Sequence, residues 1–413
     1  MTSRERMLAA ISGEKTDHVP LYSWVFGFRA PDHLAWSREG KKRTFWYTGR
    51  LEHLHKLPQS WNIEDDFKRA ETWLSLGMDD VLDVSVPWSQ DSKVTFADLF
   101  KPAGKNESEG KYPVMTREYQ TPDGKICHSV QKTNEEEKPG WVIQPDCVPL
   151  IEDFNIPRAV RHLVTEPADV AKIKWLYQGP TQQQQKWFAE RMRKVADFAA
   201  KRGVMVQAWS AFGMDAAVWF AGAEGAIMLC MEHPDAFDEL LGVIHAADKA
   251  RTALALQYPV DMVCQRGWYS STDFWSPAIF KKFLKPRIAE LAAMAHKAGK
   301  KFGYVMTTGV MTLGVELMEA GVDLLYYVDP VQDHVDLAKA KKIFGGKMAV
   351  AGGVNSSITL SAGTSDQIRE EVRTALEVFG NKGGFILSPV DALFPDTPWN
   401  TVETRIAAWR EGR

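Results

Sequence analysis

The chain has 413 residues, of which 45% are hydrophobic, so it can build one large core or two smaller ones. Its 50 basic and 53 acidic residues are interspersed and leave a net charge of -3, which argues against nucleic acid or a membrane surface as a partner and makes small molecules the expected ligands. The four cysteines occur without a C-x-x-C pair, so the sequence indicates neither a disulfide framework nor a structural zinc motif.

The N-terminal sequence predicts a short helix followed by the first strand. It has no apolar run of signal-peptide length, and no later segment approaches the ~20 apolar residues of a membrane-spanning helix, so we expect a soluble, cytoplasmic protein. Thr2 and Glu5 form a capping-box pattern, and Gly13 ends this helix. Residues 19–24 predict the first strand, and an amphipathic helix over 63–76 precedes a second strand over 80–84.

Residues 99–149 break this order of helices and strands. The stretch REYQTPDGKICHSVQKT alternates polar and apolar residues around a Pro-Asp-Gly turn, which is typical of a β-hairpin. We interpret 99–149 as a hairpin insertion after the second strand, within a single domain that spans residues 1–413.

The remaining chain alternates strands and helices. Strands are predicted over 204–209, 260–265, 301–306, 322–328, 347–351 and 383–388, with helices such as 277–297 and 364–379 between them. With the two early strands this makes eight. The pattern favours an α/β fold of the (β/α)8 TIM-barrel type, and a doubly wound sheet is the alternative.

In a barrel the reactive groups stand at the C-terminal ends of the strands, and candidate residues can be collected by that position. The candidates are mostly aromatic and carry few charges, which suits a flat, largely neutral ligand better than a polyanion. They are Asp83, Trp88, Trp209, Gln265, Arg266, Trp268, Tyr269, Tyr304, Met306, Thr308, Tyr327, Asp329, Asn355 and Asp391.

For two charged candidates, Asp391 and Arg266, the sequence allows either a functional or a purely structural role. Asp391 follows the last strand in GFILSPVDALFPDTPWN. There it can protonate a leaving oxygen, bind paired N–H donors of a pterin ring, orient a tyrosine, or only cap the loop. Arg266 can bind a carboxylate of a ligand in two-point fashion, or form a structural ion pair with Asp273 or Asp329.

Five segments together resemble the uroporphyrinogen decarboxylase superfamily, which includes the corrinoid-dependent methyltransferases. They are TSRERMLAAISGEKTDHVPL, SPAIFKKFLKPRI, ELMEAGVDLLYYVDP, AVAGGVNSS and SPVDALFPDTPWNTV, in the order of the family. The hairpin around TPDG is more similar to the methyltransferase branch. The resemblance implies a homodimer, a corrinoid carried by a separate partner protein, and a methoxyaromatic or tetrahydrofolate-type small molecule.

The sequence departs from the family at the positions that bind zinc in the methyltransferases and at the histidine of the decarboxylases. Methyltransferases of this type carry a His-x-Cys-Gly after the fifth strand and a cysteine in the closing loop, which together bind zinc. Met306, Thr308 and Asp391 stand there, and a thioether, a hydroxyl and one carboxylate are a poor zinc set, so no zinc is expected. The histidine of the decarboxylases also falls on Asp391, and their arginine-rich entrance is represented only by Arg29, Arg43 and Arg50.

The leading hypothesis is therefore a methyltransferase of a corrinoid-dependent demethylation system that works without zinc. In it, Asp391, Tyr304 or Arg266 acts as the catalytic group that stabilises the leaving oxygen, and the other candidates bind the substrate. The alternatives are a zinc-free decarboxylase or lyase that acts on an aromatic or tetrapyrrole-like acid, and a binding protein without catalysis.

Overall fold

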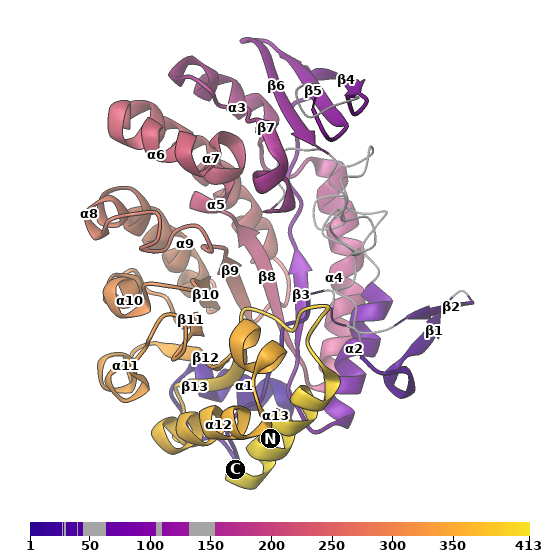
Figure 1. Ribbon diagram of the computed structural model, residues 1–413, viewed down its shortest axis with the longest axis vertical. Helices are drawn as coiled ribbons and strands as arrows, with labels where there is room; N and C mark the ends of the chain where they lie inside the picture. The colour runs from indigo at the N-terminus through magenta and orange to yellow at the C-terminus, as the bar shows by residue number, and fades with distance from the viewer. Residues whose placement is uncertain (27, 29, 39, 44–62, 105–109, 132–152) are drawn as a thin grey trace.

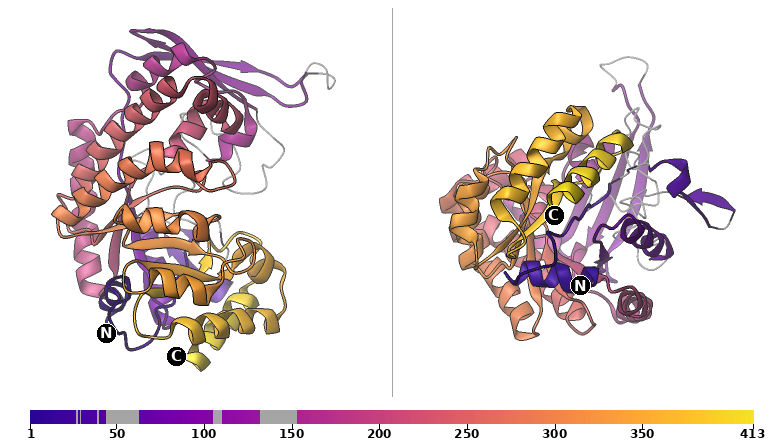
Figure 2. Two further views of the ribbon diagram at one scale, coloured as in Figure 1. Left: turned by 90° about the vertical axis from the view of Figure 1, so that its left-hand side faces the viewer. Right: turned by 90° about the horizontal axis from the view of Figure 1, so that it is seen from below.

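A parallel sheet of seven strands organises the computed structural model, which describes residues 1–413 except 27, 29, 39, 44–62, 105–109 and 132–152 (Figure 1). Its order is β13-β12-β11-β10-β9-β8-β3, so strands that neighbour each other in the sheet follow each other in the chain. The bounds are β3 Val81–Ser85, β8 Met205–Ala211, β9 Met262–Gln265, β10 Lys301–Val305, β11 Leu324–Val328, β12 Ala349–Asn355 and β13 Phe385–Val390. The curled sheet with helices on its outside confirms the predicted barrel-type α/β fold (Figure 2).

The first predicted strand, 19–24, is the exception, because it makes only isolated bridges. Leu21 pairs with Leu387 and Val25 with Leu393, both in parallel. On the other side the N–H of Asp79 donates to the carbonyl of Leu21 at 2.8 Å, while the Asp79 carboxylate accepts the N–H of Leu21 at 3.2 Å. The Asp79 carboxylate thus takes the backbone N–H of Leu21 that would otherwise donate to a neighbouring strand. The ladder of backbone hydrogen bonds therefore stops at Leu21. The segment nevertheless bridges β13 and the start of β3.

Most helices lie on the outside of the sheet, and both chain ends lie at one end of the molecule (Figures 1 and 2). The helices are α1 Ser3–Ile11, α2 Ile63–Ser75, α3 Val170–Leu176, α4 Gln182–Arg202, α5 Met214–Ala221, α6 Ala223–Glu232, α7 Pro234–Ala255, α8 Pro277–Ile279, α9 Lys285–Lys297, α10 Val310–Glu319, α11 Leu337–Phe344, α12 Ser365–Phe379 and α13 Trp399–Gly412. The helix expected over 277–297 contains a π turn at Phe280–Leu284, just before Pro286, whose ring nitrogen cannot donate to the preceding turn.

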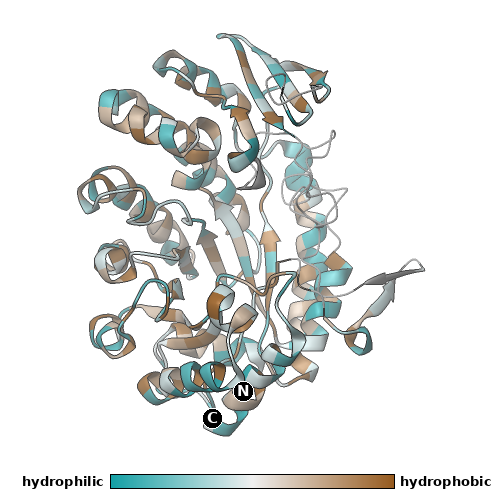
Figure 3. Cartoon of the chain, viewed as in Figure 1, coloured by the Kyte–Doolittle hydropathy of each residue, from teal (hydrophilic) through white to brown (hydrophobic). Residues whose placement is uncertain are grey.

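The strands bury both of their faces, in two separate apolar clusters. Outward residues such as Val206, Val263 and Phe302 pack against the helices. Inward residues such as Met205, Met262 and Val305 pack with one another and with α1, which covers the bottom of the barrel. This two-sided burial is why the strands read as nearly continuous apolar runs, coloured brown and white in Figure 3.

A second sheet of four antiparallel strands stands beyond the C-terminal end of β3 (Figure 1). It consists of β4 Thr95–Lys101, β5 Val114–Thr121, β6 Gly124–Gln131 and β7 Ala159–Arg161. β5 and β6 form a hairpin around the Pro-Asp-Gly turn. Of the predicted insertion 99–149, residues 105–109 and 132–149 lie outside the described part of the chain.

Within the described ranges no single helix is long and apolar enough to cross a membrane. Only α5 and α6 pass such a test as a pair, with a bend of 103° between them, and every residue of α5 is buried in the protein.

Candidate functional site

Three tryptophans gather at the C-terminal end of the barrel. Trp268, from the loop after β9, lies between the other two, with ring centroids 5.9 Å from Trp24 and 6.1 Å from Trp209. Trp24 belongs to the segment that bridges β13 and β3, and Trp209 is an inward residue of β8. The three rings therefore line the region where a barrel of this type binds its ligand.

Two of these three indoles donate their ring N–H to a carboxylate. Trp268 Nε1 donates to Asp391 Oδ1 at 3.3 Å, and Trp209 Nε1 donates to Asp83 Oδ1 at 2.9 Å. Asp391 has a φ of 70°, in the left-handed region that aspartate tolerates better than most residues. The structure thus brings together two acids and three aromatic rings from five separate parts of the chain.

Asp83 is the more enclosed of the two acids. Its Oδ1 accepts two N–H groups, one from Trp209 and one from the side-chain amide of Gln207, whereas its Oδ2 has no hydrogen-bond partner among the described residues. Burial raises the pKa of Asp83 above its ordinary value, although the Arg69 guanidinium, also buried, opposes that rise. Asp83 can therefore hold a proton at a pH where an exposed aspartate cannot.

Tyr327 lies close to Asp391 and is almost completely buried. Burial raises the pKa of the Tyr327 hydroxyl well above its ordinary value, and the nearby Asp391 charge adds to the rise. Tyr327 therefore stays a neutral hydrogen-bonding group beside this acid at any pH near neutrality.

Arg266 lies among aromatic rings and does not pair with Asp273 or Asp329, so that predicted ion pair is wrong. Its guanidinium carbon is 4.7 Å from the ring centroid of Trp268 and 4.9 Å from that of Trp219. Among the described residues its guanidinium lies near the carboxylate of Asp215, with Arg266 Nε 3.9 Å from Asp215 Oδ2. The cation thus stands behind the tryptophan cluster and supports it by cation–π contacts.

Three further predicted residues lie at or just after the ends of β10, β11 and β12, and two of them contact each other. Asn355 Nδ2 donates to Asp329 Oδ2 at 2.7 Å, and Asp329 Oδ1 accepts the N–H of Val331 at 2.8 Å. Thr308 donates its hydroxyl to Asp273. These contacts hold the loops at the rim, so the side chains of Asp329 and Asn355 organise the backbone there.

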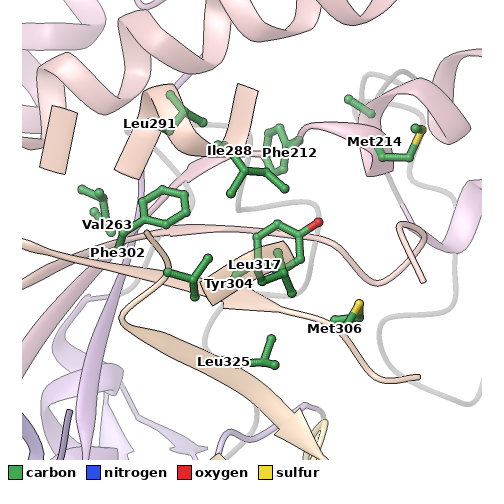
Figure 4. Close-up of a cluster of buried hydrophobic side chains, with 14 of the residues drawn as sticks. Phe212, Met214, Val263, Ile288, Leu291, Phe302, Tyr304, Met306, Leu317 and Leu325 are labelled. Carbon is green, nitrogen blue, oxygen red and sulfur yellow. The ribbon is translucent and has the colours of Figure 1, made fainter. Parts of the chain in front are cut away.

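The structure does not bring Tyr304, Met306, Gln265, Trp88 or Tyr269 into the barrel interior. Tyr304 and Met306 belong to the outward cluster with Phe212, Ile288 and Leu291 (Figure 4), and the Tyr304 hydroxyl is 2.5 Å from Ser270 Oγ. Gln265 is buried against the backbone of Gly213, Trp88 packs 5.6 Å from the Tyr177 ring, and Tyr269 donates its N–H to Asp215 at 3.0 Å. Strand alternation is the reason for Gln265, Tyr304 and Met306, because their neighbours Cys264, Gly303 and Val305 face inward. Trp88 and Tyr269 lie in the loops after β3 and β9.

A model of the uroporphyrinogen decarboxylase family matches residues 151–412, which is more than half of the sequence. The chain belongs to this family. The resemblance found in the sequence is thereby confirmed.

Two curated relatives of this family member carry the name methylcobamide:CoM methyltransferase MtaA. They come from Methanosarcina barkeri and from Methanosarcina barkeri (strain Fusaro / DSM 804), and they are 25% and 26% identical over 181 residues, which are 42% of this chain and 48% of each relative. The chain thus spans about half the length of the curated relatives it matches. A solved methyltransferase from Methanosarcina mazei covers 100% of the chain with a TM-score of 0.57 and 17% identity, which shows a shared fold.

Met306, Thr308 and Asp391 stand where the resemblance places the zinc ligands of the methyltransferases. Met306 is fully buried in the outward apolar cluster, Thr308 donates to Asp273, and Asp391 accepts from Trp268. These three groups face different partners and do not form a zinc donor set. In the described part of the chain no three His, Cys, Asp or Glu side chains come close enough to hold a metal ion. Arg29, Arg50 and the side chain of Arg43 fall outside the described residues.

Gln207 and Trp24 lie in the site but are not among the residues predicted from the sequence. The strand β8 contains two polar residues, Gln207 and Ser210, and Gln207 shares its parity with the inward residue Trp209. This shared parity is the signal that would have placed Gln207 in the interior. Trp24 ends the first predicted strand, so its position was available by the same rule that selected the other strand ends.

A buried clamp behind the site was also missed. Arg251 on α7 donates to the carbonyls of Val86 at 2.9 Å and Trp209 at 3.3 Å, just after β3 and within β8. Asp248 accepts the N–H groups of Phe212 at 3.0 Å and of Gly213 at 2.9 Å. The pair therefore fixes the strand ends that carry Asp83 and Trp209, and only tertiary structure brings α7 to them.

Proposed function

We propose that this protein is a methyltransferase of a corrinoid-dependent demethylation system. It moves a methyl group between a small methoxyaromatic donor, or a tetrahydrofolate-type acceptor, and a corrinoid protein. The observation that carries this proposal is the pair of carboxylates, Asp83 and Asp391, that face a tryptophan cluster at the barrel mouth. The names of the curated relatives and the family match support the class of reaction.

The tryptophan cluster accounts for the kind of ligand. The N–H groups of Trp209 and Trp268 are already donated to carboxylates, so a ligand would meet the faces and edges of their rings. Ring faces bind flat aromatic molecules by stacking, at about 0.5–1.5 kcal/mol per ring pair beyond burial. An anisole-like ring or a pterin fits this description, and a molecule with many carboxylates does not.

The carboxyl groups of Asp83 and Asp391 explain how the oxygen of the donor is stabilised when its bond to the methyl group breaks. The corrinoid, held by its own protein, supplies the cobalt that takes the methyl group. As the methyl–oxygen bond breaks, its electron pair stays on the oxygen of the donor, and this negative charge needs a proton or a hydrogen bond. Asp83, which burial keeps protonated to a higher pH, and Asp391 are the groups placed to provide it.

The test mixes the purified chain with a corrinoid protein, or with free cob(I)alamin, and with a panel of methoxyarenes and methyltetrahydrofolate. We expect the cob(I)alamin absorbance to convert to that of the methylated corrinoid with at least one donor. Asp391→Asn should slow this conversion by about a hundredfold or more. The matched control is Asp123→Asn, an exposed aspartate on the hairpin turn, which should leave the rate unchanged.

Other outcomes would contradict the proposal. Release of carbon dioxide from an aromatic or tetrapyrrole-like acid by the chain alone would identify a zinc-free decarboxylase instead. Tight ligand binding without turnover in any partner mixture would identify a binding protein. Tightly bound stoichiometric zinc would overturn the zinc-free mechanism.

A further inference from the structure

A chain of hydrogen bonds runs inside the barrel from β11 to Asp83. The hydroxyl of Tyr326 donates to Gln207 Oε1 at 3.1 Å, and the thiol of Cys264 lies 3.6 Å from the same oxygen. The side-chain amide of Gln207 then donates to Asp83 Oδ1, which also accepts from Trp209. All of these side chains are at least nine-tenths buried.

This arrangement fixes the orientation of the Gln207 amide. Burial raises the pKa of both the Tyr326 hydroxyl and the Cys264 thiol well above their ordinary values, so each keeps its hydrogen and can donate it. Two donors that converge on one amide oxygen hold that oxygen in place, and the NH2 group must then point the other way. It points to Asp83.

The same geometry distinguishes the two oxygens of Asp83. A carboxylate oxygen has two in-plane lone pairs, and both lone pairs of Oδ1 are taken by N–H groups, from Gln207 and Trp209. Oδ2 has no hydrogen-bond partner among the described residues. A proton on this carboxyl group can therefore reside only on Oδ2, which is buried and which shares this proton with no other described residue.

We propose that Gln207, held by Tyr326, is a positioning residue that makes Asp83 present a protonated Oδ2 to an oxygen of the ligand. This inference rests on the methyl transfer proposed above and assigns the proton to one of its two acids. As the methyl–oxygen bond of the donor breaks, the oxygen keeps the electron pair and takes the proton from Asp83 Oδ2. The methyl group passes to the corrinoid of the partner protein, so the products are the methylated corrinoid, the demethylated hydroxyl compound and the Asp83 carboxylate, which regains its proton from water. The ligand must accordingly offer an ether or phenolic oxygen at this point.

Several other titratable groups face Asp83 and belong in any analysis of its titration. They are Arg69 from α2, Asp80 at the start of β3, Tyr22 from the bridging segment, Tyr326 and Tyr327 from β11, and Cys264 from β9. Arg69 favours the Asp83 carboxylate, and burial opposes it. Variants of Gln207 leave all of these groups in place, so a change in the titration of Asp83 reports the amide itself.

The first test is infrared spectroscopy, which detects protonated carboxyl groups without any substrate. The difference between wild type and Asp83→Asn isolates the Asp83 band. In Gln207→Leu we expect the titration midpoint of Asp83 to rise. The reason is that the variant removes a hydrogen bond that stabilises the Asp83 carboxylate in the wild type. In Tyr326→Phe we expect the band to shift in frequency, since the amide is no longer held. Tyr119→Phe, a buried tyrosine of the insertion sheet, is the control and should leave the band unchanged. Unchanged midpoint and frequency in both variants would overturn the proposal.

The second test measures methyl transfer with cob(I)alamin and the best donor. Asp83→Asn should lower kcat by about a hundredfold, which is typical for loss of a general acid, and Gln207→Leu by about tenfold with little change in KM. A change confined to KM would also overturn the proposal, because it would make Asp83 a binding group only. If wild type transfers no methyl group with any donor, the proposed function fails, and the infrared result still decides whether Gln207 positions Asp83.

Discussion

The Arg251–Asp248 clamp offers the sharpest test of how the barrel mouth is held. Both side chains are buried, with an exposed fraction of 1% each. Arg251 donates to three acceptors besides Asp248, namely the carbonyls of Val86 and Trp209 and the hydroxyl of Tyr177, at distances between 2.9 and 3.3 Å. We predict that Arg251→Met destabilises the protein strongly although methionine fills much of the same volume.

The expected magnitude follows from what the substitution leaves behind. Breaking a buried ion pair by removing one partner costs about 3–5 kcal/mol, because the other charge stays buried without compensation. Asp248 keeps the Tyr177 hydroxyl at 2.8 Å and the N–H groups of Phe212 and Gly213, which places the loss toward the lower end of that range.

The loss should also depend on pH, with a defined sign. Burial raises the pKa of Asp248 above its ordinary value, and Arg251 opposes this rise, so the variant raises it further. A carboxyl group whose pKa is higher in the folded state than in the unfolded state stabilises the fold at low pH and loses that contribution as the pH rises through the folded pKa. The deficit of Arg251→Met should therefore be larger at pH 8 than at pH 5.

Urea unfolding followed by tryptophan fluorescence measures these free energies. Adding Asp248→Asn to Arg251→Met removes the buried charge and should restore part of the stability, and the double-mutant cycle gives the coupling. Arg373→Met removes an exposed arginine that pairs with Glu370 and Glu377 on α12 and should have a much smaller effect. A loss below about 1 kcal/mol for Arg251→Met, or a double variant no more stable than the single one, would refute the buried-charge argument.

Three further predictions concern other parts of the fold. Burial raises the pKa of Asp80 to about 7, so wild-type stability should fall as the pH rises from about 4 through 7, and Asp80→Asn should flatten this slope in melting curves recorded across that range. Arg405 is completely buried, and among the described residues its guanidinium has one hydrogen-bond partner, Ser23; Arg405→Met should therefore raise the free energy of unfolding in urea by about 1 kcal/mol or more, and a loss would refute this. Because the hydroxyl of Tyr304 contacts Ser270 on the outward face of β10, Tyr304→Phe should cost about 1 kcal/mol of stability and leave methyl-transfer kcat within twofold, whereas a large loss of kcat would return Tyr304 to the reaction.

The order of strands could be predicted from the sequence because each one is a short apolar run between turn signals. Seven of the predicted strands are present. Of the candidates collected at their C-terminal ends, Asp83, Trp209, Trp268 and Asp391 are connected by two hydrogen bonds and one contact between rings. The first predicted strand forms only isolated bridges. Its apolar residues did not indicate that the Asp79 side chain would accept the backbone N–H of Leu21 and so end the ladder.

What the sequence alone determined is the family, the barrel and the set of strand ends at which chemistry can occur. Which of the two faces of each strand points to the interior was decided only by tertiary structure, because strands buried on both faces carry apolar residues on both and do not mark the inward one. That is why Tyr304 was selected and Gln207 was overlooked. The clamp from α7 and the amide that orients Asp83 depend on contacts between residues far apart in the chain, and local patterns in the sequence do not contain them.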